Sequence, residues 1–149
     1  MKKRCKRRVT PALPPRGLRP RLASDQVRDL GFVHVGHLDD LAYGRADGDK
    51  LWQWLGGLLT WHRVAQKLQR GVPEMDDQLA LAQSVMARFG RTGRMGFSGA
   101  EYQLAKRGVM VMDQLAEQVD RATAIAAAEW SELTINRIAK TRQPESMAS

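Results

Sequence analysis

The sequence predicts an all-α protein: a small helical bundle of about four helices, with a long C-terminal helix and a disordered basic N-terminal arm. Apolar residues recur at steps of three and four along residues 24–140, which is the period of one face of a helix. Turn signals at Asp47-Gly48-Asp49, at Gly71 and along the glycine-rich run 90–96 divide this stretch into segments. No convincing strand pattern and no internal repeat accompany them.

The first helix is predicted to run from Ser24 to about Tyr43. Ser24 can cap a helix through its hydroxyl, and the positive end of the helix dipole favours the acidic Asp25 that follows. The residues expected to be buried recur at helical spacing: Val27, Leu30, His34, Leu38 and Leu41.

The second helix is predicted over residues 50–70, between a cap at Asp49 and the stop signal of Gly71 and Pro73. Its many apolar residues indicate a helix that is central to the core. The expected buried stripe is Leu51, Leu55, Leu58, His62, Ala65 and Leu68, with Trp52, Trp54, Leu59 and Trp61 on neighbouring faces.

The third helix is predicted over residues 74–89, because Pro73 suits a first turn and acidic residues follow it. Residues 90–96 are expected to form a flexible basic loop. The buried stripe expected for this helix is Met75, Leu79, Ala82, Met86 and Phe89.

The fourth helix is predicted to begin with a capping box formed by Ser98 and Glu101. An unbroken helix to about Lys140 would hold about 42 residues and span about 63 Å, more than a small domain needs. Either it breaks near residues 120–123, or its C-terminal half packs against another subunit. The alanines of residues 122–128 favour a dimer, and the competing interpretation is a small domain with a projecting helix. The expected seam is Tyr102, Ala105, Val109, Met112, Ala116, Val119, Thr123, Ala126, Trp130 and Leu133.

The predicted organisation is an arm at residues 1–23, a helical domain at 24–142 and a frayed C-terminus at 143–149. The arm holds nine of the 24 basic residues and no acidic residue, so the remaining 15 face all 16 acidic residues. The domain is therefore nearly neutral, although the chain carries a net charge of +8. The cations of the arm are candidate contacts to phosphates: Lys2, Lys3, Arg4, Lys6, Arg7, Arg8, Arg16, Arg19 and Arg21.

Length and composition predict a protein of the cytoplasm or of another reducing environment. At 149 residues, one domain can bury a core without disulfides, and the single cysteine, Cys5, cannot form an intramolecular bridge. The basic start lacks the apolar stretch of a signal peptide, and the segment 51–61 is too short to span a membrane. We therefore expect a cytoplasmic protein with no membrane partner.

The sequence carries no signature of catalysis: a nucleophile elbow, a phosphate-binding loop and a His-Glu-x-x-His helix are all missing. His34 and His37 lie one turn apart and His62 is distant, which is weak support for a metal site. The adjacent acids Asp39-Asp40 and Asp76-Asp77 point about 100° apart on a helix. We expect no enzymatic activity, no metal and no cofactor.

Two further sets of residues are candidates for binding. Arg91 and Arg94 precede the helix start at Ser98, where backbone amides favour an anion, so they are candidate phosphate contacts. The tryptophans of the second helix are expected in the core and not as stacking platforms for bases. The candidate interface with a protein partner is Trp130, Ile135 and Ile138.

The order of these features resembles small uncharacterised helical proteins of proteobacterial phages and prophages. The resemblance rests on the basic arm, the segment Gly17-Leu18-Arg19-Pro20, the tryptophan-rich helices, the Gly-Arg-Thr-Gly-Arg run at 90–94 and the alanine-rich last helix. It implies a bacterial cytoplasm and a mobile genetic element. It brings no established activity and no catalytic residues.

The leading hypothesis is a non-enzymatic nucleic-acid-associated accessory protein whose arm binds phosphates electrostatically. The alternative is an adaptor or inhibitor that binds a host or phage protein through its helical surface. A helix-turn-helix regulator is weaker, because the loop after Phe89 is long and no recognition helix stands out. The choice between DNA and RNA, sequence specificity, the protein partner, the oligomeric state and the continuity of the last helix stay open.

Overall fold

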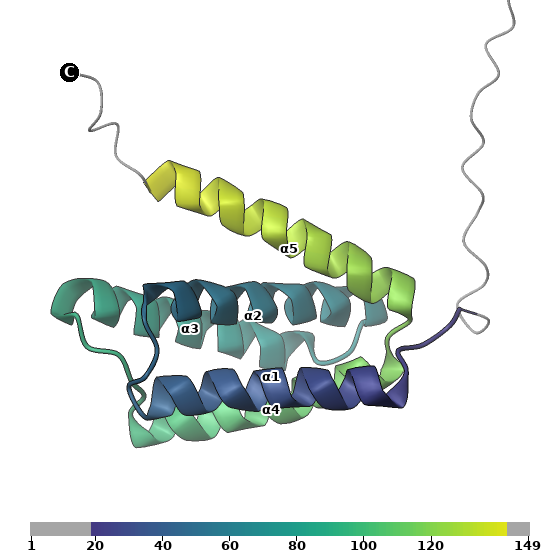
Figure 1. Cartoon of the computed structure of the whole chain (residues 1–149), viewed down its shortest axis with the longest axis horizontal. Helices are drawn as coiled ribbons and strands as arrows, with labels where there is room; N and C mark the ends of the chain where they lie inside the picture. The colour runs from purple at the N-terminus through teal and green to yellow at the C-terminus, as the bar shows by residue number, and fades with distance from the viewer. Residues whose placement is uncertain (1–18, 143–149) are drawn as a thin grey trace, which may run out of the picture.

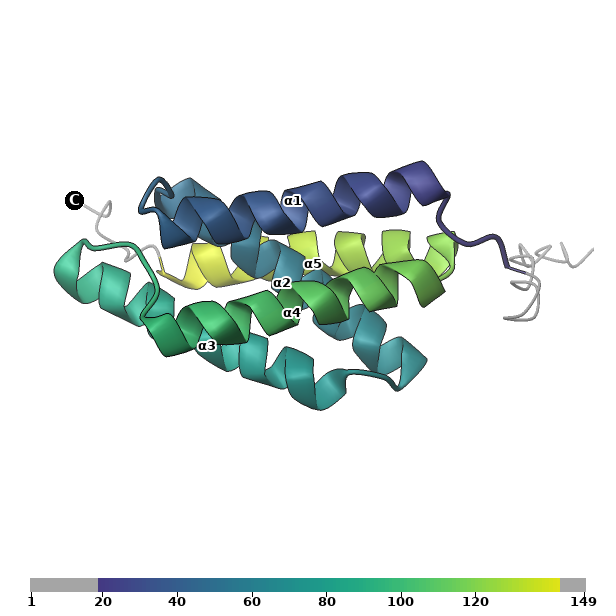
Figure 2. The same ribbon diagram turned by 90° about the horizontal axis from the view of Figure 1, so that it is seen from below.

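The computed structural model describes residues 19–142, so the predictions for Lys2 to Arg16 and for residues 143–149 lie outside it. The described chain is an up-and-down helical bundle in which each helix runs antiparallel to the preceding one (Figures 1 and 2). The all-α class is confirmed, and the only pairing of strand type between residues 19 and 142 is an isolated bridge. The helices are α1 (Ser24–Ala42), α2 (Gly48–Leu68), α3 (Val72–Thr92), α4 (Gly99–Gln118) and α5 (Arg121–Arg142).

The bundle has five helices and not about four, because the long last helix is broken. Val119 adopts an extended backbone with φ −76° and ψ 141°, and its side chain is fully buried. Asp120 then caps α5, since its carboxylate accepts hydrogen bonds from the backbone N–H and the hydroxyl of Thr123 at 2.9 and 2.7 Å. The break, at residues 119 and 120, lies at the start of the range 120–123 near which the sequence offered a break as one alternative.

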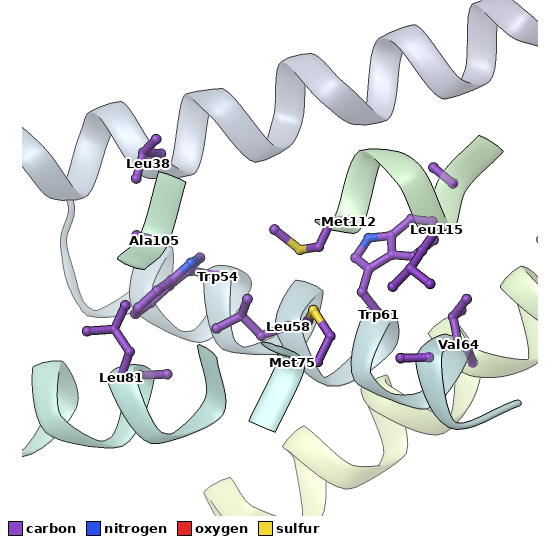
Figure 3. Packing of buried hydrophobic residues seen from close by; sticks show 14 of the residues in the cluster. Leu38, Trp54, Leu58, Trp61, Val64, Met75, Leu81, Ala105, Met112 and Leu115 are labelled. Carbon is purple, nitrogen blue, oxygen red and sulfur yellow. The ribbon is translucent and has the colours of Figure 1, made fainter. Parts of the chain in front are cut away.

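Helix α2 lies at the centre and packs against all four other helices. Figure 3 shows its tryptophans and leucines meeting side chains of α1, α3 and α4. The buried face of α2 is rotated about the helix axis relative to the predicted stripe, because Leu55, His62 and Leu68 are only partly buried. The two large indole rings at positions seven residues apart set the buried face, which consists of Leu51, Trp54, Leu58, Trp61, Val64 and Ala65.

Helices α3 and α4 approach closely where Gly108 faces Gln78. Gln78 is 2% exposed, and its side-chain amide donates a 2.8 Å hydrogen bond to the carbonyl of Leu104. A Cβ atom at Gly108 would lie 2.2 Å from this side chain, so only glycine fits there. The buried face of α3 is consequently Met75, Gln78, Leu81, Ala82 and Val85, in place of the predicted stripe with Leu79, Met86 and Phe89.

The helix starts agree with the sequence only in part. The capping box is confirmed, because Ser98 Oγ accepts from the N–H of Glu101 and Glu101 Oε1 accepts from the N–H of Ser98. The caps predicted at Ser24 and Asp49 were wrong. Ala23 precedes α1, and Asp47 caps α2 by accepting from the N–H of Lys50.

Among the helices of residues 19–142, α5 packs against α2 alone. Its buried residues are Ala127 and Ser131, and the Ser131 hydroxyl donates a 2.7 Å hydrogen bond to the carbonyl of Gly56. The predicted seam does not hold in this half, because Leu133 is 66% exposed. Small side chains let α5 lie close to α2. The packing of α5 against a second subunit stays a prediction.

A search of residues 19–142 for a membrane-spanning helix finds none of sufficient length and apolarity.

Candidate nucleic-acid interface

The described end of the arm is held at the corner between α4 and α5. The backbone N–H of Arg121 donates a 2.9 Å hydrogen bond to the carbonyl of Pro20, and Arg21 forms an isolated antiparallel bridge with Asp120. Figure 1 shows this segment reaching the bundle beside the first turn of α5. The arm therefore leaves the body from a defined point.

Asp120 at this corner is 4% exposed and remains ionised at neutral pH. Burial raises the pKa of Asp120, but the hydrogen bonds from Thr123 and the charge of Arg19 outweigh burial and hold the pKa below its ordinary value. The buried carboxylate thus links the cap of α5 to the cationic arm electrostatically.

A groove of about 320 Å³ lies next to the corner, between α2 and α5. Three of its lining residues are cations, namely Arg19 from the arm and Arg63 and Lys67 from α2, and none of the described lining residues is acidic. The guanidinium of Arg63 lies over the ring of Trp130, 5.0 Å from its centroid. We name the groove that contains Arg19, Arg63, Lys67 and Trp130 the corner groove.

The corner groove has the chemistry that an anionic ligand requires. Arginine presents a planar fork of donors that matches phosphate oxygens, and lysine adds a point charge. The alanines at 122, 126 and 127 and the Trp130 ring supply an apolar wall beside those cations. Such a wall suits a sugar or base attached to the phosphate.

The structure separates the two predicted groups of phosphate contacts. Arg19 and Arg21 lie at the corner, whereas Arg91 in the last turn of α3 and Arg94 in the following loop lie at the opposite end of the bundle (Figures 1 and 2). The predicted loop is shorter, because α3 continues to Thr92 and Gly93 ends it with φ 66°. The 20 residues of α4 span about 30 Å, so a single phosphate cannot contact both groups.

Two further basic residues near this loop make contacts within the protein. Arg88 donates to the carboxylate of Glu101 at 2.8 Å and to the carbonyl of Gly96 at 3.0 Å. The ammonium of Lys106 lies over the ring of Tyr102 at 5.6 Å. Arg88 therefore stabilises the loop, and the exposed cations within residues 90–96 are Arg91 and Arg94.

His34 and His62 contact different carboxylates and do not lie in one site. His34 is buried against Trp61 and lies 3.3 Å from the carboxylate of Asp113, while His62 lies 2.7 Å from that of Asp76. Burial lowers the pKa of His34 below its ordinary value, and Asp113 only partly offsets this. Residues 19–142 hold no group of three histidine, cysteine or carboxylate side chains placed for a metal ion.

One of the paired acids is a structural residue. Asp40 accepts hydrogen bonds from Lys50 at 2.6 Å and from Arg45 at 3.3 Å. These two cations lower the pKa of Asp40 below its ordinary value. The carboxylate therefore joins α1 to the start of α2.

The three residues predicted for a protein interface do not form one surface. Trp130 lines the corner groove, Ile135 a shallow groove between α2 and α5, and Ile138 an apolar groove at the far end of α5. Sequence reasoning missed Arg63 and Lys67, although two cations four residues apart mark one exposed strip of a helix. Their pairing with Trp130 depends on how α5 crosses α2.

No protein-family model, curated protein or solved structure matches this chain.

Proposed function

We propose that this protein is a non-enzymatic nucleic-acid-binding accessory protein whose arm and corner groove bind phosphates of one ligand. One observation carries the proposal: the basic arm enters the body beside the place where the body itself offers Arg63 and Lys67. The resemblance to proteins of phages and prophages adds a mobile genetic element as the proposed setting.

Electrostatics sets the expected strength and its salt dependence. Each phosphate that a cation neutralises contributes about −0.9 to the slope of log affinity against log salt for duplex DNA. Six arm cations would give a slope of about −5, and three groove cations would bring it to about −8. Such a ligand loses at least about 10³-fold in affinity between about 50 and 200 mM salt.

The test is a salt series of fluorescence anisotropy with labelled duplex DNA and with single-stranded RNA. An arm variant replaces Lys2, Lys3, Arg4, Lys6, Arg7 and Arg8 by serine and keeps residues 19–22, which belong to the corner. A groove variant carries Arg63→Glu and Lys67→Glu. The charge-matched control carries Lys106→Glu and Arg107→Glu on the exposed side of α4.

We expect the arm variant to flatten the salt slope by about five and the groove variant by about two, with the control close to the parent. A preference for RNA or DNA would identify the ligand. Unchanged affinity and slope in the arm variant would contradict the proposal, as would equal losses in the groove variant and the control.

Duplex length tests whether Arg91 and Arg94 take part. At 3.4 Å per base pair, about nine base pairs cover the roughly 30 Å between the two ends of the bundle. An Arg91→Glu, Arg94→Glu variant should therefore bind an 8-bp duplex like the parent and a 20-bp duplex about tenfold more weakly. Equal binding of both duplexes by parent and variant would limit the interface to the corner.

A further inference from the structure

An apolar groove of about 430 Å³ lies at the end of the bundle away from the arm. It exists because α3 and α5 both pack against α2 but do not pack against each other. Figure 1 shows α5 crossing α2 at an angle, with its C-terminal end toward the end of the bundle where α3 ends. We name it the far groove, and its large apolar lining residues are Trp52, Leu55 and Leu59 of α2, Leu79 and Met86 of α3, and Ile138 of α5.

These six apolar side chains are partly exposed. Each of them is only half-buried, whereas Leu51, Trp54 and Leu58 on the neighbouring face of α2 are buried. A ligand that covers the groove therefore removes apolar surface from water, and each methylene group that it buries should raise its affinity about three- to fourfold. The far groove consequently favours an occupant with an apolar chain.

The far groove has an apolar end and a charged end. Helices α2 and α3 run antiparallel on either side of the short connection 69–71, so Leu59 and Leu79 lie at the end of the groove nearer to that connection. Trp52 lies about two turns further from the connection. The guanidinium of Arg142 lies 5.8 Å from the centroid of the Trp52 ring, which places the charge at the opposite end from the two leucines.

The charged end suits a carboxylate. Arg142 is the charged residue of the described lining, and none of the ion pairs within residues 19–142 involves it. A guanidinium donates two parallel hydrogen bonds to a carboxylate. One cation matches the single charge of a carboxylate better than the nearly two charges of a phosphate monoester at neutral pH.

The volume of the far groove suits a small molecule. Sites for small ligands hold about 300–1,000 Å³, and the far groove lies within this range. The wall of α3 from Leu79 to Gly90 is about 16 Å long, and a helix of about 10 Å diameter and that length would occupy roughly 1,250 Å³. A docked helix would therefore place only one row of its side chains in the groove, whereas a single alkyl chain can lie inside it.

We propose that the far groove binds a fatty acid, with its alkyl chain against Leu55, Leu59 and Ile138 and its carboxylate on the guanidinium of Arg142. This site goes beyond the proposed nucleic-acid binding, because the corner groove lies at the other end of α5 and shares no described lining residue with it. Binding of the fatty acid requires no nucleic acid.

Isothermal titration calorimetry of the full chain, without nucleic acid, tests the proposal with hexanoate, octanoate and decanoate as monomers up to about 1 mM. Affinity should rise at least about tenfold from octanoate to decanoate, because two methylene groups are added to the buried chain. Decyltrimethylammonium, which has the same chain and the opposite charge, should bind at least about tenfold more weakly than decanoate.

Variants separate the groove from the general attraction of an anion to a basic chain. Arg142→Glu should weaken decanoate at least about tenfold and strengthen decyltrimethylammonium, whereas Arg137→Glu, an exposed charge reversal on the same helix, should bind both like the parent. The corner variant with Arg63→Glu and Lys67→Glu removes twice as much charge and should also bind decanoate like the parent.

Ile138→Glu should weaken decanoate at least about tenfold, and Leu133→Glu, on the exposed face of α5, should not. The exposed substitution Arg142→Glu preserves the test if Ile138→Glu does not fold.

The absence of decanoate binding at about 1 mM would overturn the proposal. Equal losses in Arg142→Glu and Arg137→Glu, or an affinity that does not depend on chain length, would overturn it as well, because either result shows attraction to surface charge alone. Association of the ligand-free protein that Ile138→Glu abolishes would assign the far groove to a second copy instead.

Discussion

Helices α4 and α5 follow each other in the chain and have similar lengths, 20 and 22 residues, but they use their surfaces differently. Helix α4 packs against α1, α2 and α3, whereas α5 packs against α2 alone. The corner groove, the shallow groove at Ile135 and the far groove are all lined by α5. A helix that completes a core contributes stability, and a helix laid across a finished core creates binding surfaces on its flanks.

The largest expected effect comes from the same substitution in both helices. Leu115 of α4 is 3% exposed and Leu133 of α5 is 66% exposed. Leu115→Ala should lower the free energy of unfolding by about 2–5 kcal/mol, because it leaves a cavity, and Leu133→Ala by no more than about 0.5 kcal/mol. Urea unfolding monitored by circular dichroism measures both. Similar losses would show that the two helices do not differ in this way.

Replacement of glycine by alanine at two helix interfaces should give the next largest difference in the free energy of unfolding. Gly108→Ala should destabilise by about 1–3 kcal/mol, because its Cβ would meet Gln78 at 2.2 Å. At Gly56, which faces α5, the nearest atoms to a Cβ are Ile135 Cγ1 and Ser131 Oγ, both at 3.9 Å. Gly56→Ala should therefore stabilise by up to about 1 kcal/mol through helix propensity. A loss at Gly56 in thermal unfolding would show that the α2–α5 interface is packed as tightly as the α3–α4 interface.

Removal of the cap between α4 and α5 should have a smaller and more local effect. Asp120→Ala should cost about 1 kcal/mol and increase amide hydrogen exchange in the first turns of α5 more than in α4. The folded pKa of Asp120 lies below its ordinary value of 3.8, so its contribution is present above that pH and is lost as pH falls through the folded value. The parent should reproduce the exchange pattern of the variant in acid, and uniform exchange across both helices would contradict this local role.

The smallest expected effect is a pH dependence that involves α4 and not α5. The pKa of His34 is lowered by burial despite its contact with Asp113 of α4, and burial also lowers the pKa of His37. The unfolded chain therefore binds more protons than the folded protein below about pH 6.5, and the free energy of unfolding should fall as pH decreases. Its full value is present above that pH.

Urea unfolding at about pH 7.5 and about pH 5.5 measures this difference, and His34→Gln should reduce it. We attribute to His37 the pH dependence of the free energy of unfolding that remains in His34→Gln. An unchanged slope in His34→Gln would remove His34 as the cause, and faster exchange confined to α5 at the lower pH would place the sensitive group elsewhere.

The sequence determined the helical class but not the phase of each buried face. Leu55 and Leu58 look equivalent by spacing, yet Trp54 and Trp61 rotate α2 so that Leu58 is buried and Leu55 lines the far groove. The burial of Gln78 depends on a hydrogen bond to Leu104 of α4, which no local pattern reveals. The periodicity of the sequence locates each helix separately, whereas packing against the other helices determines which face of the helix is buried.

The candidate site was less predictable for a related reason. Charge located Arg19 and Arg21, but the corner groove also needs Arg63 and Lys67, which α5 brings beside Trp130. Arg91, in the last turn of α3, and Arg94, in the loop that follows, lie at the other end, because α3 runs the length of the bundle away from the corner. Ion-binding surfaces composed of several helices follow from the order and direction of those helices.

The hydrogen bond between Arg121 and Pro20 also gives the molecule a mechanical property. A ligand that pulls on the arm acts on this hydrogen bond at Pro20, four residues before the start of α1. Since α5 packs on α2 alone among the described helices, this load acts on the helix with the fewest neighbours and not on the core of α1 to α4.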